Sequence, residues 1–384
     1  MQPHSDSQQT IQKLIDIVGK QHVLTQESET RLYRQGRRYG AGQVLAVVVP
    51  GTLLEQWQVL QAAVDADCIV IMQAANTGLT GGSTPFGDDY DRPVVLMSTR
   101  RLAGIQIIRD GQQVICLPGA TLDRLEKELA PFNREPHSVI GSSCIGASVL
   151  GGVCNNSGGA LVRRGPAYTE LALYARVNES GQLELINHLG VDLGHTPEEI
   201  LSRLQNQQYQ TADVQHNPSC CASDQRYAHD VKQVNEATPA RFNADPSRLF
   251  EASGSAGKIC VFAVRLDTFE KIPSQVFYVG TNSQDDLTEI RRFLLTDLPR
   301  LPIAGEYIHR VAYDIGAEYG KDTFVFIEKF GTAKVPAAFA MKDKVDGYLE
   351  KVGMKGLSDK VLQLITKFMP NHLPERMNQF RDQY

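Results

Sequence analysis

The chain has 384 residues, more than one hydrophobic core usually organises, so we expect two or three structural units. Hydrophobic residues make up 42% and charged residues 22%, and the net charge is −5, a globular composition that excludes wholesale disorder. No apolar run approaches the roughly 20 residues that span a bilayer, and no apolar segment of a secretory signal opens the chain.

The first elements in chain order form a strand–helix–strand pattern. A short amphipathic helix is expected over 11–19, and a buried strand over 44–49. Thr52 and Glu55 then form a capping box that begins a helix over 52–64, followed by a strand over 68–72. This order predicts a βαβ unit in which the two strands pair in parallel.

Strands and helices continue to alternate through the middle of the chain. We expect a domain boundary near 268–275 and a surface excursion in the polar stretch 206–240. The seven cysteines, odd in number and scattered, indicate reduced thiols of a cytosolic protein. The adjacent Cys220 and Cys221 lack the spacing of a structural zinc site, so no metal is expected. Further strands are predicted over 93–97, 113–117, 171–177, 183–187 and 259–266, and helices over 121–130, over 197–204 and from 283.

Two glycine-rich segments, 74–83 and 141–159, carry the strongest functional signal. Glycine lets the backbone approach a ligand closely, and successive main-chain N–H groups in such turns can bind phosphate without a basic side chain. Neither segment contains Lys or Arg, and Asn76, Thr77, Ser83 and Ser148 could add side-chain donors. Either segment alone could be an ordinary tight turn, but two of them in one acidic domain favour the pyrophosphate of a dinucleotide.

Common nucleotide motifs do not fit these segments. Gly141 and Gly146 have the spacing of a Walker loop, but Ala147 follows where that loop needs Lys. Neither segment supplies the G-x-G-x-x-G fingerprint of a Rossmann fold between a strand and a helix. The sequence therefore indicates a dinucleotide site of a different kind.

The C-terminal end is basic on an otherwise acidic chain. Residues 331–384 contain nine Lys and Arg against six Asp and Glu. Such a segment is either a solvated helical face or a docking surface for nucleic acid or phospholipid headgroups. Aromatic residues do not interleave with the basic ones as stacking platforms would, so nucleic acid is not an expected partner.

The glycine-rich segments resemble the FAD domain of the vanillyl-alcohol oxidase and p-cresol methylhydroxylase type. Within that type, the chain is similar to the respiratory, quinone-dependent D-lactate dehydrogenases of bacteria from about residue 10 to its end. The stretches that carry the resemblance are PGTLLEQW, MQAANTGLTGGSTP, REPHSVIGSSCIGAS, NADPSRLFEASGSAGK and LPIAGEYIHR. They are long and collinear, which makes the resemblance specific.

The resemblance implies which residues hold FAD. The first loop would wrap the pyrophosphate, the second segment would line its other side, and a late strand would pass beside the adenine. Family members with covalent flavin carry a His in the first loop, so the Asn76-Thr77 found here implies noncovalent FAD. The implied FAD-binding residues are Ala74, Ala75, Asn76, Thr77, Gly78, Gly82, Ser83, Gly141, Ser148, Gly158 and Val261.

The implied reaction is the oxidation of D-lactate to pyruvate, with electrons passed to a quinone. The resemblance also implies peripheral binding to an anionic phospholipid surface at the cytoplasmic face of the inner membrane. Relatives carry much of the substrate domain in a C-terminal region that this chain does not show, so we expect a truncated version whose catalytic residues are unknown. Oxidation of another D-2-hydroxy acid, or a catalytically silent FAD-binding fragment, are the alternatives.

Five further residues are candidates with two interpretations each. His309 could be a base and Arg310 a carboxylate clamp, against a His that begins a helix and a surface Arg. His137 more plausibly fixes the loop backbone than contacts flavin, and Arg163-Arg164 is favoured as a surface ion pair over a phosphate contact.

Together these signals predict an α+β protein. We expect a two-subdomain FAD-binding domain of the p-cresol methylhydroxylase type over 1–268, the start of a substrate or cap domain over 269–310, and a basic helical membrane-associated segment over 311–384.

Overall fold

The computed structural model describes residues 5–36, 39–138, 146–158, 160–215, 219–237, 247–255, 257–331, 334–351, 354 and 357–369. The chain divides into two compact units. Unit 1 comprises 1–159, 164–227 and 241–271, and unit 2 comprises 160–163, 228–240 and 272–384. The predicted domain boundaries at 268 and 310 stay predictions.

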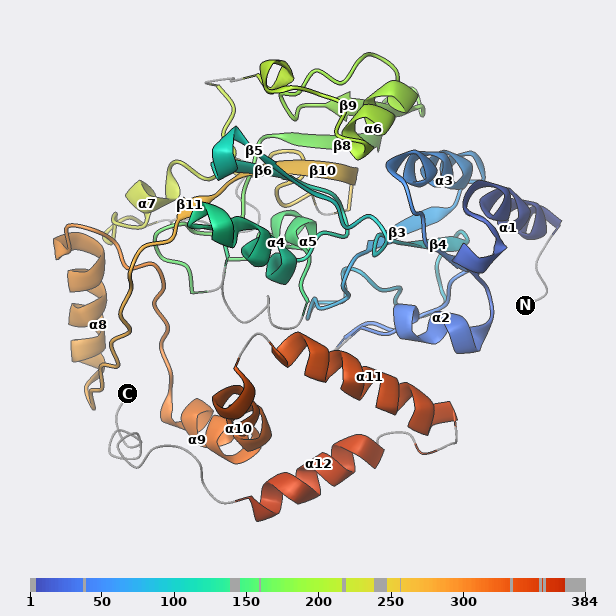
Figure 1. Cartoon of the computed structure of the whole chain (residues 1–384). Coiled ribbons are helices and arrows are strands. Elements are labelled where there is room, and N and C mark those ends of the chain that lie inside the picture. The colour runs from blue at the N-terminus through green and yellow to red at the C-terminus, as the bar shows by residue number, and fades with distance from the viewer. Residues whose placement is uncertain are drawn as a thin grey trace. The chain divides into compact units, whose positions relative to one another are not determined.

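The first part of unit 1 is a four-stranded sheet in the order β1-β2-β4-β3. Figure 1 labels β3 and β4 of this sheet. Its strands are β1 (Val23–Leu24), β2 (Ala46–Val48), β3 (Ile69–Gln73) and β4 (Val94–Ser98). β4 pairs in parallel with both β2 and β3. The predicted direct pairing of the 44–49 and 68–72 strands is therefore wrong, because a strand from later in the chain lies between them.

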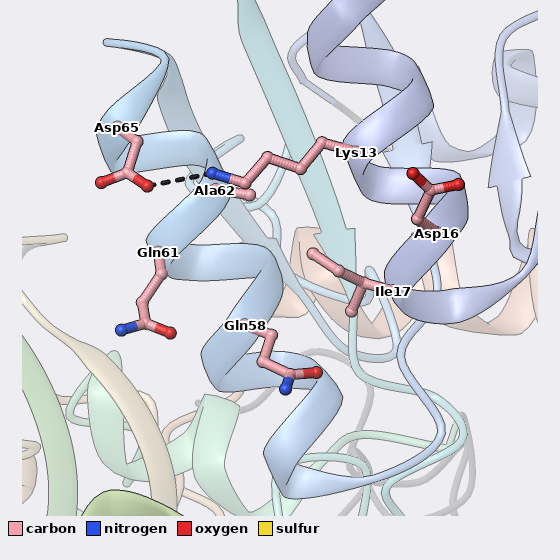
Figure 2. A pocket seen from close by; sticks show the side chains of 7 residues that line it. All are labelled: Lys13, Asp16, Ile17, Gln58, Gln61, Ala62 and Asp65. Carbon is pink, nitrogen blue, oxygen red and sulfur yellow. Dashed lines mark hydrogen bonds and ion pairs between the residues drawn. The ribbon is translucent and has the colours of Figure 1, made fainter.

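Helices α1 (Ser5–Val18), α2 (Glu27–Arg34) and α3 (Leu53–Asp65) accompany this sheet. The hydroxyl of Thr52 accepts a hydrogen bond from the main-chain N–H of Glu55 at 3.1 Å, which begins α3 as predicted. The Glu55 carboxylate accepts from Gly51 N–H at 2.6 Å rather than from Thr52, one residue earlier than in a capping box. A depression of about 490 Å³ lies between α1 and α3, beside an exposed ion pair of Lys13 and Asp65 at 3.0 Å (Figure 2).

The second part of unit 1 is an antiparallel five-stranded sheet in the order β5-β6-β10-β8-β9. Trp57 of α3 lies 6.3 Å, centroid to centroid, from Phe262 of this sheet, within a core shared with the first sheet. The strands are β5 (Ile105–Ile108), β6 (Gln113–Cys116), β8 (Ala172–Val177), β9 (Leu183–Asn187) and β10 (Cys260–Asp267). The helices are α4 (Leu122–Leu129), α5 (Val149–Cys154) and α6 (Pro197–Gln205), and the short α7 (Tyr227–Asp230) begins at the last residue of the 164–227 segment of unit 1 and continues into unit 2. A two-stranded sheet joins β7 (Arg134–Glu135) to β11 (Phe269–Glu270).

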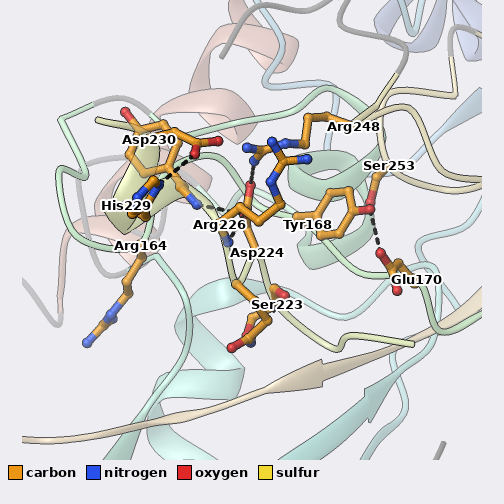
Figure 3. A network of polar contacts seen from close by, with 12 residues as sticks. Arg164, Tyr168, Glu170, Ser223, Asp224, Arg226, His229, Asp230, Arg248 and Ser253 are labelled. Carbon is orange, nitrogen blue, oxygen red and sulfur yellow. Dashed lines mark hydrogen bonds and ion pairs between the residues drawn. The ribbon is translucent and has the colours of Figure 1, made fainter. Parts of the chain in front are cut away.

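The polar stretch 206–240 is only partly the surface excursion that the sequence predicts. Asp224 forms an ion pair with Arg248, and both side chains are almost fully buried (Figure 3). The Asp224 carboxylate also accepts from the main-chain N–H groups of Arg226 and Tyr227, each at 2.9 Å. Ser223 donates to the carboxylate of Asp267 at 2.6 Å. Buried polar contacts, which composition does not reveal, thus fix residues 223–227 to unit 1.

Unit 2 is mainly helical in its described part. Its helices are α8 (Gln284–Arg292), α9 (Arg310–Tyr319), α10 (Lys321–Phe330), α11 (Val335–Lys351) and α12 (Leu357–Phe368). Several large apolar side chains of these helices face solvent; Phe368, for example, is 79% exposed. None of the helices described here is long and apolar enough to cross a bilayer. A mixed sheet and a larger antiparallel sheet with flanking helices in unit 1, and helices in unit 2, agree with the predicted α+β class.

Candidate cofactor-binding site

The first glycine-rich loop (residues 74–83) follows the end of β3 and is closed by side-chain hydrogen bonds. Ser83 donates its hydroxyl hydrogen to Asn76 Oδ1 at 3.0 Å, across the loop. Asn76 Nδ2 donates to the carbonyl oxygen of Gln35 at 2.8 Å, and Asn76 itself adopts a left-handed backbone with φ of 53°. The loop is therefore pinched at its two ends and fastened to the segment after α2.

The main-chain N–H groups of this loop are available for a ligand. Within the described residues, no N–H from Ala74 to Ser83 donates a hydrogen bond; the next one, of Thr84, donates to Gly81 O at 3.2 Å. The loop carries no charged side chain. A row of free amide donors without competing charge is the arrangement that binds phosphate oxygens through the backbone.

The second glycine-rich segment is described from Gly146 onward, so Gly141 lies outside the described residues. The Ser148 hydroxyl accepts from the N–H of Gly151 at 3.1 Å and thereby begins α5. Gly158 packs against Pro166 so closely that an added Cβ would lie 2.7 Å from the Pro166 Cα. Gly158 is thus required for close packing, whether or not it also contacts a ligand.

Three of the predicted regions lie near one another in unit 1. A Cβ added to Gly82 would lie 4.0 Å from Asn155 Oδ1, at the end of α5, with no other heavy atom closer. Val261 of β10 packs in one core cluster with the apolar side chains of α5. Its carbonyl oxygen accepts from Gln56 Nε2 at 3.1 Å. The first loop, α5 and β10 therefore border one region, and Gly82 leaves space there.

Three of the four side chains expected to add donors, those of Asn76, Ser83 and Ser148, have partners within the protein. Ser83 donates to Asn76, Asn76 donates to the carbonyl oxygen of Gln35, and Ser148 caps a helix. These groups hold the backbone of the two segments in place. A direct contact between them and a cofactor stays a prediction, as do the roles of Ala74, Ala75, Thr77 and Gly78 in the first turn.

Arg164 and His137 fix the backbone just before residue 139. Arg164 donates to the carbonyl oxygens of Pro136 at 3.0 Å and His137 at 3.2 Å, forms an ion pair with Glu135, and stacks over Phe269 at 4.1 Å. Because Arg164 is only 8% exposed, the expected surface ion pair is wrong for this residue. His137 is also buried, and its Nε2 lies 3.4 Å from Arg164 O, which agrees with a role in holding the loop.

Arg163, His309 and Arg310 belong to unit 2. Arg163 donates to Leu301 O at 3.0 and 2.7 Å. His309 precedes α9, and its Nδ1 accepts from Val311 N–H at 3.2 Å. Both His309 and Arg310 are exposed, so their positions agree with a His that begins a helix and a surface Arg.

The thiols near the site are held in their neutral form. Burial raises the pKa of Cys154, at the end of α5, to about 11, and that of Cys260, on β10, to about 12. A thiol must lose its proton to act as a nucleophile, so neither group is reactive at neutral pH.

Sequence reasoning missed two residues that shape this region, Gln73 and Asn155. Gln73 ends an otherwise apolar strand, and its side chain is buried against the first loop. A polar residue in the last position of a buried strand was the available signal. Gly40, whose added Cβ would lie 3.4 Å from the Gly81 Cα, is a glycine that packs against the first loop and a second such signal.

Comparison with known proteins finds two segments of the chain that match family models. Residues 44–183 match the family described as FAD binding domain, and residues 276–384 match that described as D-lactate dehydrogenase, membrane binding. Among solved structures, the chain is similar to p-cresol methylhydroxylase with substrate bound (TM-score 0.48, 13% identity, 75% of this chain and 48% of the other). It is also similar to 4-ethylphenol oxidase from Gulosibacter chungangensis (TM-score 0.47, 13% identity, 75% and 47%).

Three curated relatives carry the name quinone-dependent D-lactate dehydrogenase. The protein of Haemophilus influenzae is 57% identical over 98% of this chain, and that of Escherichia coli is 55% identical over 99%. The protein of Corynebacterium glutamicum is 48% identical over the whole chain. The alignments span 67% of the length of each relative. This chain therefore belongs to the family of quinone-dependent D-lactate dehydrogenases.

Proposed function

We propose that the chain acts in the oxidation of D-lactate to pyruvate, with FAD as its bound cofactor and a membrane quinone as the final electron acceptor. D-lactate loses two electrons and two protons, from its C2–H and its hydroxyl, and the quinone gains both as it becomes a quinol. When bound, FAD supplies the two-electron acceptor that no side chain can provide. Membership of the family and the match of residues 44–183 support this assignment.

The observation that carries the proposal is the uncharged first loop, whose main-chain N–H groups donate no hydrogen bond to any residue that the structure describes. We propose that these groups bind the FAD diphosphate and that Gly82 provides the space for it beside Asn155. The protein's part is to bind and orient the cofactor and to exclude water from it. The residues proposed to line FAD are Ala74, Ala75, Asn76, Thr77, Gly78, Gly82, Ser83, Gly141, Ser148, Gly158 and Val261.

FAD is proposed to be held without a covalent bond. The first loop contains neither His nor Cys, and the nearby Cys154 stays a neutral thiol because burial raises its pKa to about 11. Acid precipitation of the protein should therefore release the flavin into the supernatant. Flavin that stays in the protein pellet would contradict noncovalent binding.

The membrane-binding part is proposed to dock on anionic phospholipid at the cytoplasmic face of the inner membrane. Residues 331–384 have three more basic than acidic side chains. On α12, Leu364 and Phe368 are 58% and 79% exposed, on a helix that also carries the exposed Lys360 and Lys367. Exposed apolar and basic side chains on one helix favour an interfacial position, to which each Lys contributes about 1 kcal/mol near an anionic surface.

The test is an anaerobic mixing experiment with the FAD-loaded protein. We expect D-lactate to bleach the visible flavin absorbance and L-lactate to leave it unchanged, and a water-soluble quinone to restore it. Faster bleaching by another D-2-hydroxy acid would contradict D-lactate as the substrate. Flavin that stays oxidised with every substrate would identify an FAD-binding chain without dehydrogenase activity.

A further inference from the structure

Gln73, the last residue of β3, is 1% exposed and uses both hydrogens of its side-chain amide. Nε2 donates to Tyr33 O at 2.8 Å and to Ser83 O at 2.7 Å. The first bond reaches α2, and the second reaches the far end of the first glycine-rich loop. One side chain thus connects the start of the loop, its end and the neighbouring helix.

The orientation of this amide is fixed by its surroundings. Both acceptors are carbonyl oxygens, which cannot donate, so only the NH₂ group can face them. The other end of the amide, Oε1, is buried and has no hydrogen-bond partner among the described residues. An unpaired buried acceptor lowers the stability of the folded protein. The side chain keeps this position despite that cost, which indicates that the two bonds donated by Nε2 determine where it lies.

These bonds matter because little else orders the loop. Between Ala74 and Ser83 the main chain donates no hydrogen bond within the described residues. The loop is otherwise held by the Asn76 and Ser83 side chains and by Thr84, whose N–H and hydroxyl both donate to Gly81 O at 3.2 Å. A loop that must be ordered when its ligand binds loses affinity to conformational entropy. A loop that is already closed presents its N–H groups without that loss.

We propose that Gln73 is a positioning residue for FAD: its amide holds the first loop closed, through Ser83 O and Tyr33 O, so that the free N–H groups are arranged for the diphosphate. Gln73 itself does not touch the cofactor. This inference rests on the proposed binding of FAD by the same loop and adds the residue that prepares it.

The alternative is that Gln73 only fills the core, and Gln106 is the matched control. Gln106 is 2% exposed and lies on β5. Its side chain also makes two hydrogen bonds away from the first loop: Nε2 donates to Leu204 O at 2.7 Å, and Oε1 accepts from the Tyr209 hydroxyl at 2.5 Å. Gln73→Met and Gln106→Met remove comparable buried bonds. We would measure FAD dissociation constants by flavin fluorescence and unfolding midpoints of the FAD-free proteins.

We expect Gln73→Met to weaken FAD binding roughly 10- to 100-fold and Gln106→Met less than about 3-fold, with similar losses of unfolding midpoint. Equal losses of FAD affinity in the two variants, or unchanged affinity in Gln73→Met, would overturn the inference. Wild-type protein that takes up no FAD would instead overturn the proposed function.

Gln73→Glu provides a readout that a merely structural role would not change, and it carries the test should Gln73→Met fail to fold. An ionised carboxyl cannot donate to the two carbonyl oxygens, whereas a protonated one can donate to one of them. The quantity to compare is the FAD affinity of Gln73→Glu divided by that of the wild type at the same pH. We expect this ratio to be lowest near pH 8 and to be at least about 5-fold higher near pH 5.5. A ratio that does not depend on pH would contradict the inference.

Discussion

Gly82→Val tests whether the space beside Asn155 belongs to the cofactor. The added Cβ meets no heavy atom closer than 4.0 Å, and Gly82 is not among the glycines with positive φ, so the FAD-free protein should tolerate the change. We expect its free energy of unfolding to change by less than about 0.5 kcal/mol. The new side chain nevertheless projects into the region bordered by the first loop and α5.

The effect of Gly82→Val on FAD affinity follows from the hydrogen bonds between the loop N–H groups and the FAD diphosphate that the new side chain would displace. A hydrogen bond from an N–H group to a charged phosphate contributes about 1.5–3 kcal/mol, so losing one weakens FAD binding roughly 10- to 100-fold. Titration of the FAD-free protein, followed by quenching of flavin fluorescence, measures this directly. Gly316→Ala is the control, because Gly316 lies in α9 with no heavy atom within 4 Å of an added Cβ. Wild-type affinity in Gly82→Val would refute the placement of the diphosphate beside Gly82.

Three further predictions concern stability, titration and the membrane. Asp224→Ala leaves the buried Arg248 without its carboxylate partner, so the free energy of unfolding measured in urea titrations should fall by about 3–5 kcal/mol. The double variant Asp224→Ala with Arg248→Met should show a smaller fall in the free energy of unfolding. The same fall in the single and the double variant would contradict a coupled pair. The pKa values of Cys154 (about 11) and Cys260 (about 12) are raised above the ordinary value of 9.0, so the folded state favours the protonated thiols. The stability that these thiols contribute is therefore complete below pH 9.0 and is lost as the pH rises from there through the two raised pKa values. The midpoint of urea unfolding should therefore decrease as the pH is raised above 9.0, and it should decrease less in Cys154→Ala. A midpoint that does not change with pH in this range would refute the role of the buried thiols. Binding to vesicles that contain anionic lipid, measured by co-sedimentation, should weaken as the salt concentration rises from about 50 to about 500 mM. Binding that does not depend on the salt concentration would contradict the role of the basic side chains.

The sequence predicted most strands and helices because their signals are local. The alternation of apolar runs marks β4, β8 and β10, and the capping residues Thr52 and Ser283 mark helix starts at which the structure shows the expected hydrogen bonds. Strand order was not predictable in the same way. The insertion of β4 between β2 and β3 depends on contacts between residues far apart in the chain, which periodicity does not report.

The candidate site likewise has features that the sequence reveals and contacts that it does not. Glycine content and the absence of charge identified the loop at 74–83, because these properties are visible residue by residue. The partners of the Gln73, Asn76 and Ser83 side chains were not visible. Gln73 and Asn76 bond to backbone carbonyls of residues far away in the sequence, and Ser83 bonds to the side-chain amide of Asn76 across the loop. The buried pair of Asp224 and Arg248 was hidden for the same reason in a stretch whose composition is that of a surface.

Hydrogen–deuterium exchange of the peptide that spans Ala74 to Ser83 would examine the cofactor loop most directly. Its main-chain N–H groups donate no hydrogen bond within the described residues, so they should exchange rapidly in the FAD-free protein. Saturating FAD should slow their exchange at least about 10-fold, because phosphate oxygens would then accept from them. Rapid exchange that persists while FAD is bound would contradict the account.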